Sequence, residues 1–143
     1  MRTASLLAAL ALGVVGTATT AQADYFGCYK DCAVPLDTDA SCKEGVSLDY
    51  DISTVDRGSS VTVLSFHGGN IELDTTEIAR TAADRNGWNR YNFAGHGRSS
   101  CLGTLSNFEK LHITAVKFNE PRALDLVRKY ARAVSIHGFS SSS

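Results

Sequence analysis

The sequence predicts an α/β protein with a mixed, largely parallel open sheet and flanking helices. Residues 61–66 form an almost continuous apolar run, which is typical of a strand buried on both faces. Two segments with helix-start signals follow it, near Asp74 and near Pro121. A second apolar run, residues 133–136, comes after the second helix. Strands that alternate with helices in this way are typical of parallel strands joined by crossover helices.

Residues 1–23 are predicted to be a secretory signal peptide. A short basic start contains Arg2, residues 6–15 form an apolar run, and residues 21–23 have the small-x-small pattern of a cleavage site. The apolar run is too short to span a bilayer as a helix. We therefore expect a secreted, extracellular protein that does not reside in a membrane.

The rest of the chain is long enough for one domain with one hydrophobic core. The full sequence has 14 basic and 15 acidic side chains and a formal net charge of −1, and without Arg2 the remainder has 13 basic and 15 acidic side chains. The basic residues form no stripe along the sequence, so we expect neither nucleic acid nor an anionic membrane as a partner.

Four cysteines in an exported chain predict disulfide bonds, and two bonds allow three pairings. Cys28 and Cys32 have a spacing that also occurs in zinc fingers, but a second close pair of ligands is missing. We therefore expect all four cysteines to be oxidised: Cys28, Cys32, Cys42 and Cys101. Residues 24–45 are interpreted as a disulfide-pinned extension, 46–139 as the α/β domain and 140–143 as a serine tail.

Alternating apolar and polar residues at 46–52 predict a half-exposed edge strand. A capping box between Asp74 and Glu77 predicts the first helix, which Gly87 ends. Its expected buried face consists of Ile78, Ala79, Ala82 and Ala83.

Two more strands are predicted at residues 91–94 and 111–116, with a loop rich in glycine and serine at 95–105 between them. Pro121 occupies an early position of the second helix, where its missing N–H costs nothing. That helix is expected to bury Ala123, Leu124, Val127, Tyr130 and Ala131.

A candidate metal site follows from two histidines that end apolar strands. His67 and His137 each precede a glycine, and if their strands are neighbours the two side chains lie on one rim of the sheet. The Gly-Gly turn after His67 can fold Glu72 back beside it. Two imidazoles and a carboxylate leave a fourth position open for water on a zinc ion. The competing interpretation is a hydrogen-bonded strand-end histidine and a surface glutamate.

Four blocks of the sequence resemble the poly-γ-glutamate hydrolase family, which includes phage-encoded depolymerases and is similar in fold to zinc carboxypeptidases. The blocks are His67–Ala79, Leu111–Thr114, Phe118–Pro121 and Val134–Gly138, in that order. The resemblance covers roughly residues 46–138. It implies a Zn²⁺ ion held by His67, Glu72 and His137, and hydrolysis of γ-glutamyl amide bonds in poly-γ-glutamate or a related substrate.

The resemblance also implies a domain that continues past the second zinc-binding histidine. We therefore expect the chain to be truncated there and its sheet to be incomplete at the C-terminal end. By analogy with zinc carboxypeptidases, the general base belongs to that later part. Glu77 and Glu120 are weak substitutes, because one is predicted in a helix cap and the other at a helix start. The alternative function is an inactive or weakly active secreted binding protein.

Two further residues are weak candidates for contact with the substrate. Arg98, in the loop before residue 111, could bind the carboxylates of polyglutamate, or it could simply be a solubilising surface charge. His112 matches a block of the family and could form a wall of the site or support a ligand. A histidine hydrogen-bonded between strands is an equally good interpretation of His112.

Overall fold

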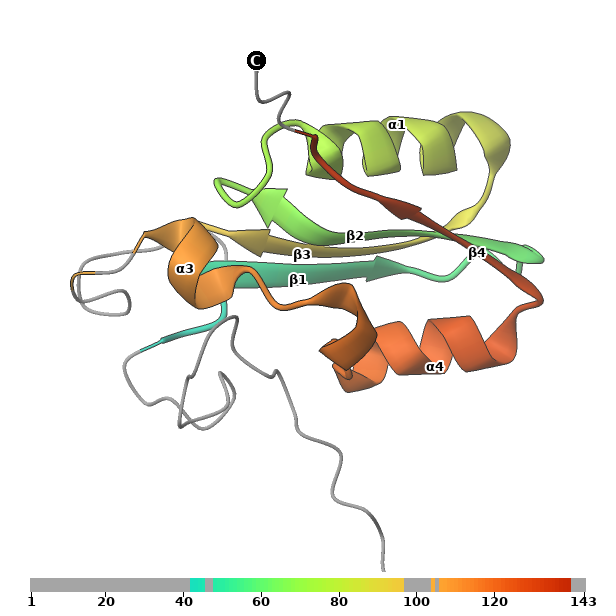
Figure 1. The fold of residues 1–143 in the computed structure, drawn as a ribbon. Coiled ribbons are helices and arrows are strands. Elements are labelled where there is room, and N and C mark those ends of the chain that lie inside the picture. The colour runs from blue at the N-terminus through green and yellow to red at the C-terminus, as the bar shows by residue number, and fades with distance from the viewer. Residues whose placement is uncertain (1–41, 46–47, 97–103, 105, 140–143) are drawn as a thin grey trace, which may run out of the picture.

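The computed structural model describes residues 42–45, 48–96, 104 and 106–139 (Figure 1). Four strands, three α-helices and a short 3-10 turn make up this part of the chain. In chain order they are β1 (Tyr50–Val55), β2 (Val61–Gly69), α1 (Thr75–Asn86), β3 (Asn89–Gly95), α3 (Asn107–Leu111), the 3-10 turn η2 (Ala115–Lys117), α4 (Pro121–Lys129) and β4 (Arg132–Ile136).

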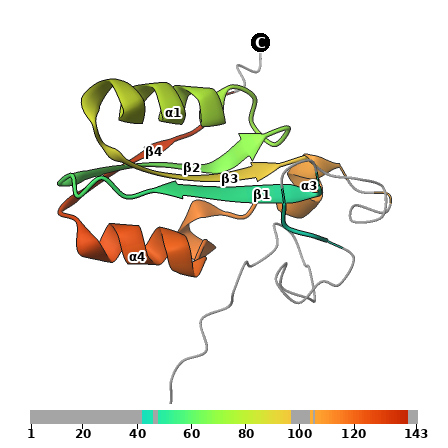
Figure 2. The ribbon, with the colours of Figure 1, turned by 180° about the vertical axis from the view of Figure 1, so that it is seen from behind.

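The four strands form one sheet in the order β1-β3-β2-β4. Strand β2 pairs in parallel with both β3 and β4, whereas β1 pairs antiparallel with β3. Helix α1 lies on one face of the sheet and α4 on the other, so the domain has three layers (Figures 1 and 2). The predicted mixed, largely parallel α/β architecture is therefore confirmed.

The hydrophobic core lies on both faces of β2. The larger cluster lies on the face covered by α4 and includes Leu64, Phe66 and Phe93. The smaller cluster lies under α1 and includes Val63, Ala79 and Ala83. Eight consecutive residues of β2 are buried, from Val61 to Gly68, as expected of a strand covered on both sides. Strand β4, in contrast, is exposed along most of its length.

The predicted strand at residues 111–116 is wrong. Leu111 ends α3, and the 3-10 turn begins at Ala115. Helix α3 forms because Ser106 and Glu109 make a reciprocal capping box, which sequence inspection missed. Leu111 and Ile113 are fully buried, as an apolar run demands, but they pack beneath the sheet instead of joining it.

The predicted capping box at the start of α1 is also wrong. Asp74 adopts a left-handed conformation with φ of 67°, and its side chain makes no capping hydrogen bond. Glu77 instead pairs with Arg80 one turn later. The C-terminal end at Gly87 is as predicted. Of the predicted buried face, Ala79 and Ala83 are buried, whereas Ile78 is 50% exposed.

Helix α4 begins at Pro121, as predicted. The side chain of Glu120 caps it by accepting a hydrogen bond from the Ala123 amide at 3.0 Å. Glu120 is almost completely buried, and Arg122 neutralises it at 2.6 Å. Leu126, together with the predicted Ala123, supplies the buried face of the helix. Leu124 and Val127 are only partly buried, and Ala131 is exposed.

The edge strand predicted at residues 46–52 lies a few residues later, at Tyr50–Val55. Cys42 is buried and is not a free thiol. The predicted signal peptide, Cys28, Cys32, Cys101 and Arg98 fall outside the described residues, so the disulfide pairing stays a prediction. Within the described ranges, no helix has the length and apolar character needed to cross a bilayer.

Candidate metal centre

The parallel pairing of β2 with β4 brings His67 and His137 to one edge of the sheet. Ser65 lies opposite Ile136 in this ladder, and both strands point toward the same rim. His67 follows shortly after Ser65, and His137 follows directly after Ile136. The centroids of the two imidazole rings are 5.0 Å apart. The predicted convergence of these two residues is therefore present in the structure.

The turn after β2 folds Glu72 back onto His67. The Glu72 amide donates to the His67 carbonyl oxygen at 2.8 Å, which closes the turn. The Thr75 hydroxyl lies 2.9 Å from the Glu72 carbonyl oxygen and 3.2 Å from that of His67. Gly69 adopts a φ of 65°, which favours glycine. As a result, the Glu72 Oε1 atom lies 3.2 Å from His67 Nδ1.

Gly68 is required by the close packing of this turn against α1 and β3. A Cβ atom at this position would lie 2.0 Å from Thr76 Oγ1 and 2.9 Å from the Phe93 carbonyl oxygen. The Thr76 hydroxyl also accepts a hydrogen bond from the Gly69 amide at 3.1 Å. The glycine after His67 therefore allows the strand end to approach the first turn of α1.

His67 is held rigidly, with one ring nitrogen available. Its side chain is 3% exposed, and its Nε2 atom lies 2.8 Å from the Ile113 carbonyl oxygen. Because a carbonyl oxygen can only accept, Nε2 carries the hydrogen and the neutral ring keeps its lone pair on Nδ1. Within the described structure, Nδ1 is buried and has no hydrogen-bond partner. Burial lowers the pKa of His67, which favours the neutral ring, although the contact with Ile113 opposes this shift.

Glu72 lies at the centre of a histidine–glutamate cluster that it forms with His67, His112 and His137, and both of its carboxylate oxygens have neighbours. Oε1 is 3.2 Å from His67 Nδ1 and 3.2 Å from His112 Nε2. Oε2 accepts a hydrogen bond from the Gly138 amide at 2.7 Å and lies 3.8 Å from His137 Nδ1. Burial acts to raise the pKa of Glu72, but the Gly138 hydrogen bond and nearby His67 outweigh it, so the pKa lies below its ordinary value.

His112 reaches the cluster from the segment between α3 and η2. Its ring stacks on His67 at a centroid distance of 3.9 Å and an interplanar angle of 22°. Phe108 stacks on His112 at 4.2 Å. Ligand atoms of His67, Glu72 and His112 all lie within 4.8 Å of one another. The apolar run at residues 111–116 predicts a strand for His112, whereas the capping box of Ser106 and Glu109 indicates the helix that ends just before it.

His137 is the most exposed member of the cluster. Its side chain is 42% exposed, and its ring is inclined by 61° to that of His67. The structure thus brings together all three residues expected to bind metal, and it adds His112 as an immediate neighbour. Metal binding itself stays a prediction for these residues.

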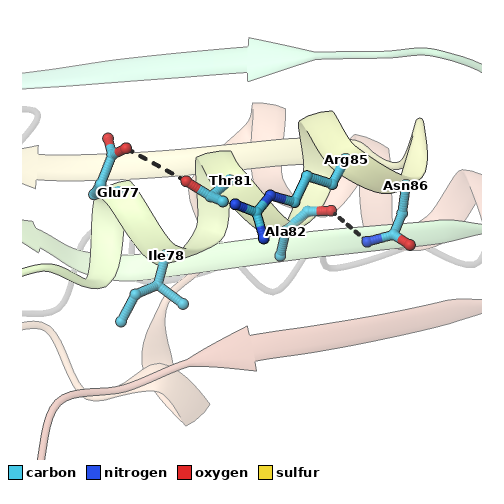
Figure 3. A pocket seen from close by; sticks show the side chains of 6 residues that line it. All are labelled: Glu77, Ile78, Thr81, Ala82, Arg85 and Asn86. Atoms are coloured by element: carbon cyan, nitrogen blue, oxygen red, sulfur yellow. Dashed lines mark hydrogen bonds between the residues drawn. The ribbon is translucent and has the colours of Figure 1, made fainter.

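The two weak candidates for a general base are engaged elsewhere. Glu77 lies on the outer surface of α1, in a groove formed with Ile78, Thr81, Ala82, Arg85 and Asn86 (Figure 3). Its carboxylate pairs with Arg80, and its side chain is 62% exposed. Glu120 is buried at the start of α4 and binds Arg122 and the Ala123 amide. Neither residue belongs to the histidine–glutamate cluster.

Comparison with known proteins identifies the family. A sequence profile described as poly-gamma-glutamate hydrolase matches residues 38–143. The chain belongs to this family. Among curated relatives, it is 39% identical over 95 residues to the SPbeta prophage-derived UPF0714 protein YoqZ of Bacillus subtilis (strain 168). It is 38% identical over 92 residues to the UPF0714 protein YndL of the same organism.

These matches cover most of the chain but a smaller share of each relative. They include 66% of this chain and 31% of YoqZ, and 64% of this chain and 33% of YndL. The chain thus spans about a third of the length of these curated relatives.

Two solved structures share the fold. A structure titled "YNDL-apo (Zinc-free)" is 36% identical with a TM-score of 0.56, covering 66% of this chain and 43% of that one. A structure titled "Structure of Bacteriophage poly-gamma-glutamate hydrolase" is 32% identical with a TM-score of 0.56, covering 66% of this chain and 42% of that one. The four-stranded open sheet with its helices matches this hydrolase structure.

Proposed function

We propose that this protein is a secreted, zinc-dependent hydrolase of γ-glutamyl amide bonds in poly-γ-glutamate. Membership of the poly-gamma-glutamate hydrolase family supports the reaction class and the substrate. The cluster of His67, Glu72 and two further histidines supports the metal. The observation that carries the proposal is the buried Nδ1 atom of His67, which faces Glu72 without a hydrogen-bond partner in the described structure.

These residues fit a zinc ion. A buried nitrogen lone pair next to a carboxylate is costly unless a cation satisfies both groups. Neutral imidazole and carboxylate are ligands that zinc prefers. The Ile113 carbonyl oxygen that fixes His67 is also the kind of partner that a metal-binding histidine uses for its second ring nitrogen.

The third protein ligand is better supplied by His137 than by His112. A metal ion lies near the plane of an imidazole ring, about 2.0–2.1 Å from the nitrogen. The rings of His67 and His112 are stacked and inclined by 22°, so their planes do not meet close to the two nitrogen atoms. The rings of His67 and His137 are inclined by 61°, so their planes can meet near an ion. The ligand atoms that lie within 4.8 Å of one another belong to His67, Glu72 and His112, so His137 has to move closer when it binds the metal. His112 then has another role, which is to hold Glu72 Oε1.

A zinc ion held by His67, Glu72 and His137 would supply polarisation of the scissile carbonyl group and a bound water molecule of lowered pKa. The protein contributes orientation. Ile113 fixes the ring of His67, and the Thr75 hydroxyl fixes the turn that carries Glu72. The amide of Gly138 and the ring of His112 hold the two oxygens of that carboxylate. His67 and Glu72, the two proposed metal ligands from β2 and its turn, are therefore held in position before metal binds.

Proton transfer is the step that the described residues support least, because the two candidate bases, Glu77 and Glu120, pair with Arg80 and Arg122. A positioned general base typically contributes about 10²–10⁴-fold to the rate. We therefore expect slow hydrolysis. If hydrolysis is undetectable while the polymer is still bound, the protein acts as a secreted binding protein.

The test uses the mature chain, residues 24–143, loaded with one equivalent of zinc. Loss of poly-γ-glutamate chain length is followed by size-exclusion chromatography with and without a chelator, alongside a His67→Ala control. We expect one zinc per chain and slow cleavage that the chelator abolishes. Cleavage that persists in the chelated protein and in the control would refute zinc dependence. Sequencing the N-terminus of protein recovered from culture medium tests secretion and cleavage after Ala23.

A further inference from the structure

His137 differs from the other expected metal ligands because it projects from an exposed edge strand. Its side chain is 42% exposed, and β4 itself is exposed from Arg132 to Ser135. An exposed histidine side chain samples several rotamers, and it must be restricted to one of them in order to bind metal. The structure shows one side-chain hydrogen bond that restricts it: Ser135 Oγ lies 2.9 Å from His137 Nε2.

We propose that Ser135 is a positioning residue of the metal centre, which holds Nε2 of His137 so that Nδ1 faces Glu72. This inference rests on the proposed zinc-dependent function. Ser135 acts through His137 and touches neither metal nor substrate. Its hydroxyl can accept a hydrogen bond from an Nε2–H group, which leaves the lone pair of the neutral ring on Nδ1.

The arrangement of His67 supports this assignment. In both histidines, Nε2 is held by an oxygen atom and Nδ1 points toward Glu72. The Ile113 carbonyl oxygen holds Nε2 of His67, and the Ser135 hydroxyl holds Nε2 of His137 in the same way. The buried ligand is therefore held by the main chain, whereas the exposed ligand is held by a side chain of its own strand.

The neighbour on the other side of His137 completes the restraint. The Gly138 amide donates to Glu72 Oε2 at 2.7 Å, which ties the chain after β4 to the carboxylate. A Cβ atom on Gly138 would lie 2.9 Å from Glu72 Cβ, so the approach is as close as glycine permits. Ser135 and Gly138 together bracket His137 from both sides, and Ser135 is the one that acts on the ring.

Removing a hydrogen-bond partner of a metal-binding histidine typically lowers metal affinity about 10–100-fold. We expect a loss of this size for Ser135→Ala in the mature chain, measured by zinc competition with a chromophoric chelator. Ser135→Thr keeps the hydroxyl group, and an edge strand tolerates β-branched residues, so this variant should bind zinc about as tightly as the wild type. Ser53→Ala, in edge strand β1, is the matched control. Equal affinity of Ser135→Ala and the wild type would overturn the proposal.

A second measurement needs no metal. Long-range ¹H–¹⁵N spectra of the metal-free protein, at a pH where the rings are neutral, report the environment of each imidazole nitrogen. Ser135→Ala should shift the Nε2 signal of His137 and leave that of His67 unchanged, because Ile113 still holds His67. Unchanged His137 signals would overturn the proposal. If the wild type binds no zinc, the proposed function fails, while these spectra still decide whether Ser135 holds His137.

Discussion

The ends of β2 and β4 carry the same local sequence, an apolar strand followed by His-Gly, but they differ in burial. The side chain of His67 is 3% exposed and that of His137 is 42% exposed. Strand β2 lies inside the sheet between β3 and β4, with clusters packed on both faces. Strand β4 lies at the edge and is mostly exposed. The position of a strand in the sheet, and not its local motif, therefore decides how firmly its histidine is held.

The largest expected difference concerns the histidines themselves. His67→Ala should abolish zinc binding and also destabilise the fold by about 1–3 kcal/mol, because it empties a buried site and leaves the Ile113 carbonyl oxygen unpaired. His137→Ala should weaken zinc binding strongly but leave the free energy of unfolding almost unchanged. Urea unfolding of the metal-free proteins and zinc titration measure the two effects.

His96→Ala is the control for both histidine variants, since His96 pairs with Asp51 and is not part of the cluster. Zinc binding should be unchanged in that protein. Equal destabilisation by His67→Ala and His137→Ala would contradict the contrast between the two strand ends.

Substitution of the glycine after each histidine should also destabilise the fold more at the end of β2 than at the end of β4, with a smaller difference than for the histidines. Gly68→Ala places a Cβ atom against the Phe93 carbonyl oxygen and the Thr76 hydroxyl, so we expect about 1–3 kcal/mol of destabilisation. Gly138→Ala places a Cβ atom 2.9 Å from Glu72 Cβ, which is fixed to the main chain, so the exposed segment after β4 has to shift. This substitution should cost less stability and chiefly weaken zinc binding. Urea unfolding compares the two variants, and a larger loss of stability in Gly138→Ala would reverse the expected order.

His112 provides a sharper test of which histidines bind the metal. His112→Phe keeps an aromatic ring between Phe108 and His67 but removes the nitrogen that contacts Glu72. If His112 only orients Glu72, zinc affinity should fall about 10–100-fold and one zinc per chain should still bind. Complete loss of zinc in the competition assay would instead assign His112 as a ligand and remove the argument for His137.

The smallest expected effect concerns the start of β4. Asp56, in the loop before β2, binds Lys129 at 2.6 Å and also accepts from the Tyr130 hydroxyl, just before β4 begins. The hydrogen bond with Lys129, followed by that with Tyr130, lowers the pKa of Asp56 from 3.8 to about 2. Because the pKa is lower in the folded state, the carboxylate stabilises the fold above its unfolded pKa, and this contribution is lost as the pH falls toward 2.

We therefore expect Asp56→Asn to be slightly less stable than the wild type at pH 6, with the difference shrinking between pH 4 and pH 2. The effect should be small because both Asp56 and Lys129 are exposed to solvent. Urea unfolding of both proteins across this range is the measurement. A difference that grows on acidification would show that the contact with Lys129 and Tyr130 does not stabilise the charged form.

The sequence was sufficient to predict the elements that burial patterns determine. The apolar run of β2 and the Pro121 start of α4 are confirmed, because each has one structural solution that satisfies both burial and backbone hydrogen bonding. The convergence of His67, Glu72 and His137 was also predictable. It depends on strand direction and on a tight glycine turn. The sequence indicates both, through the two apolar runs that end in His-Gly and the Gly-Gly pair after His67.

The position of His112 was not predictable in the same way. Leu111 and Ile113 alternate with polar residues as in a strand, yet Leu111 is the last residue of α3 and Ile113 lies in the irregular segment after it. Alternation reports which side chains are buried and does not report whether the main chain pairs with a sheet. Similarly, the residues at Asp74 and Glu77 match a capping box, but the left-handed conformation that closes the Glu72 turn removes Asp74 from the capping geometry.

The closed turn between His67 and Thr75 has a kinetic consequence. Main-chain and hydroxyl hydrogen bonds close the turn, and the Gly138 amide and the His112 ring hold the carboxylate beside the imidazole. In the proposed zinc site, these two ligands are therefore already in place before an ion binds. His137, on its exposed strand, is the less firmly held ligand of the proposed site. We therefore expect association to begin at the preformed pair and to finish at His137. Release should follow the reverse order, so the residence time of the ion is set at the edge of the sheet.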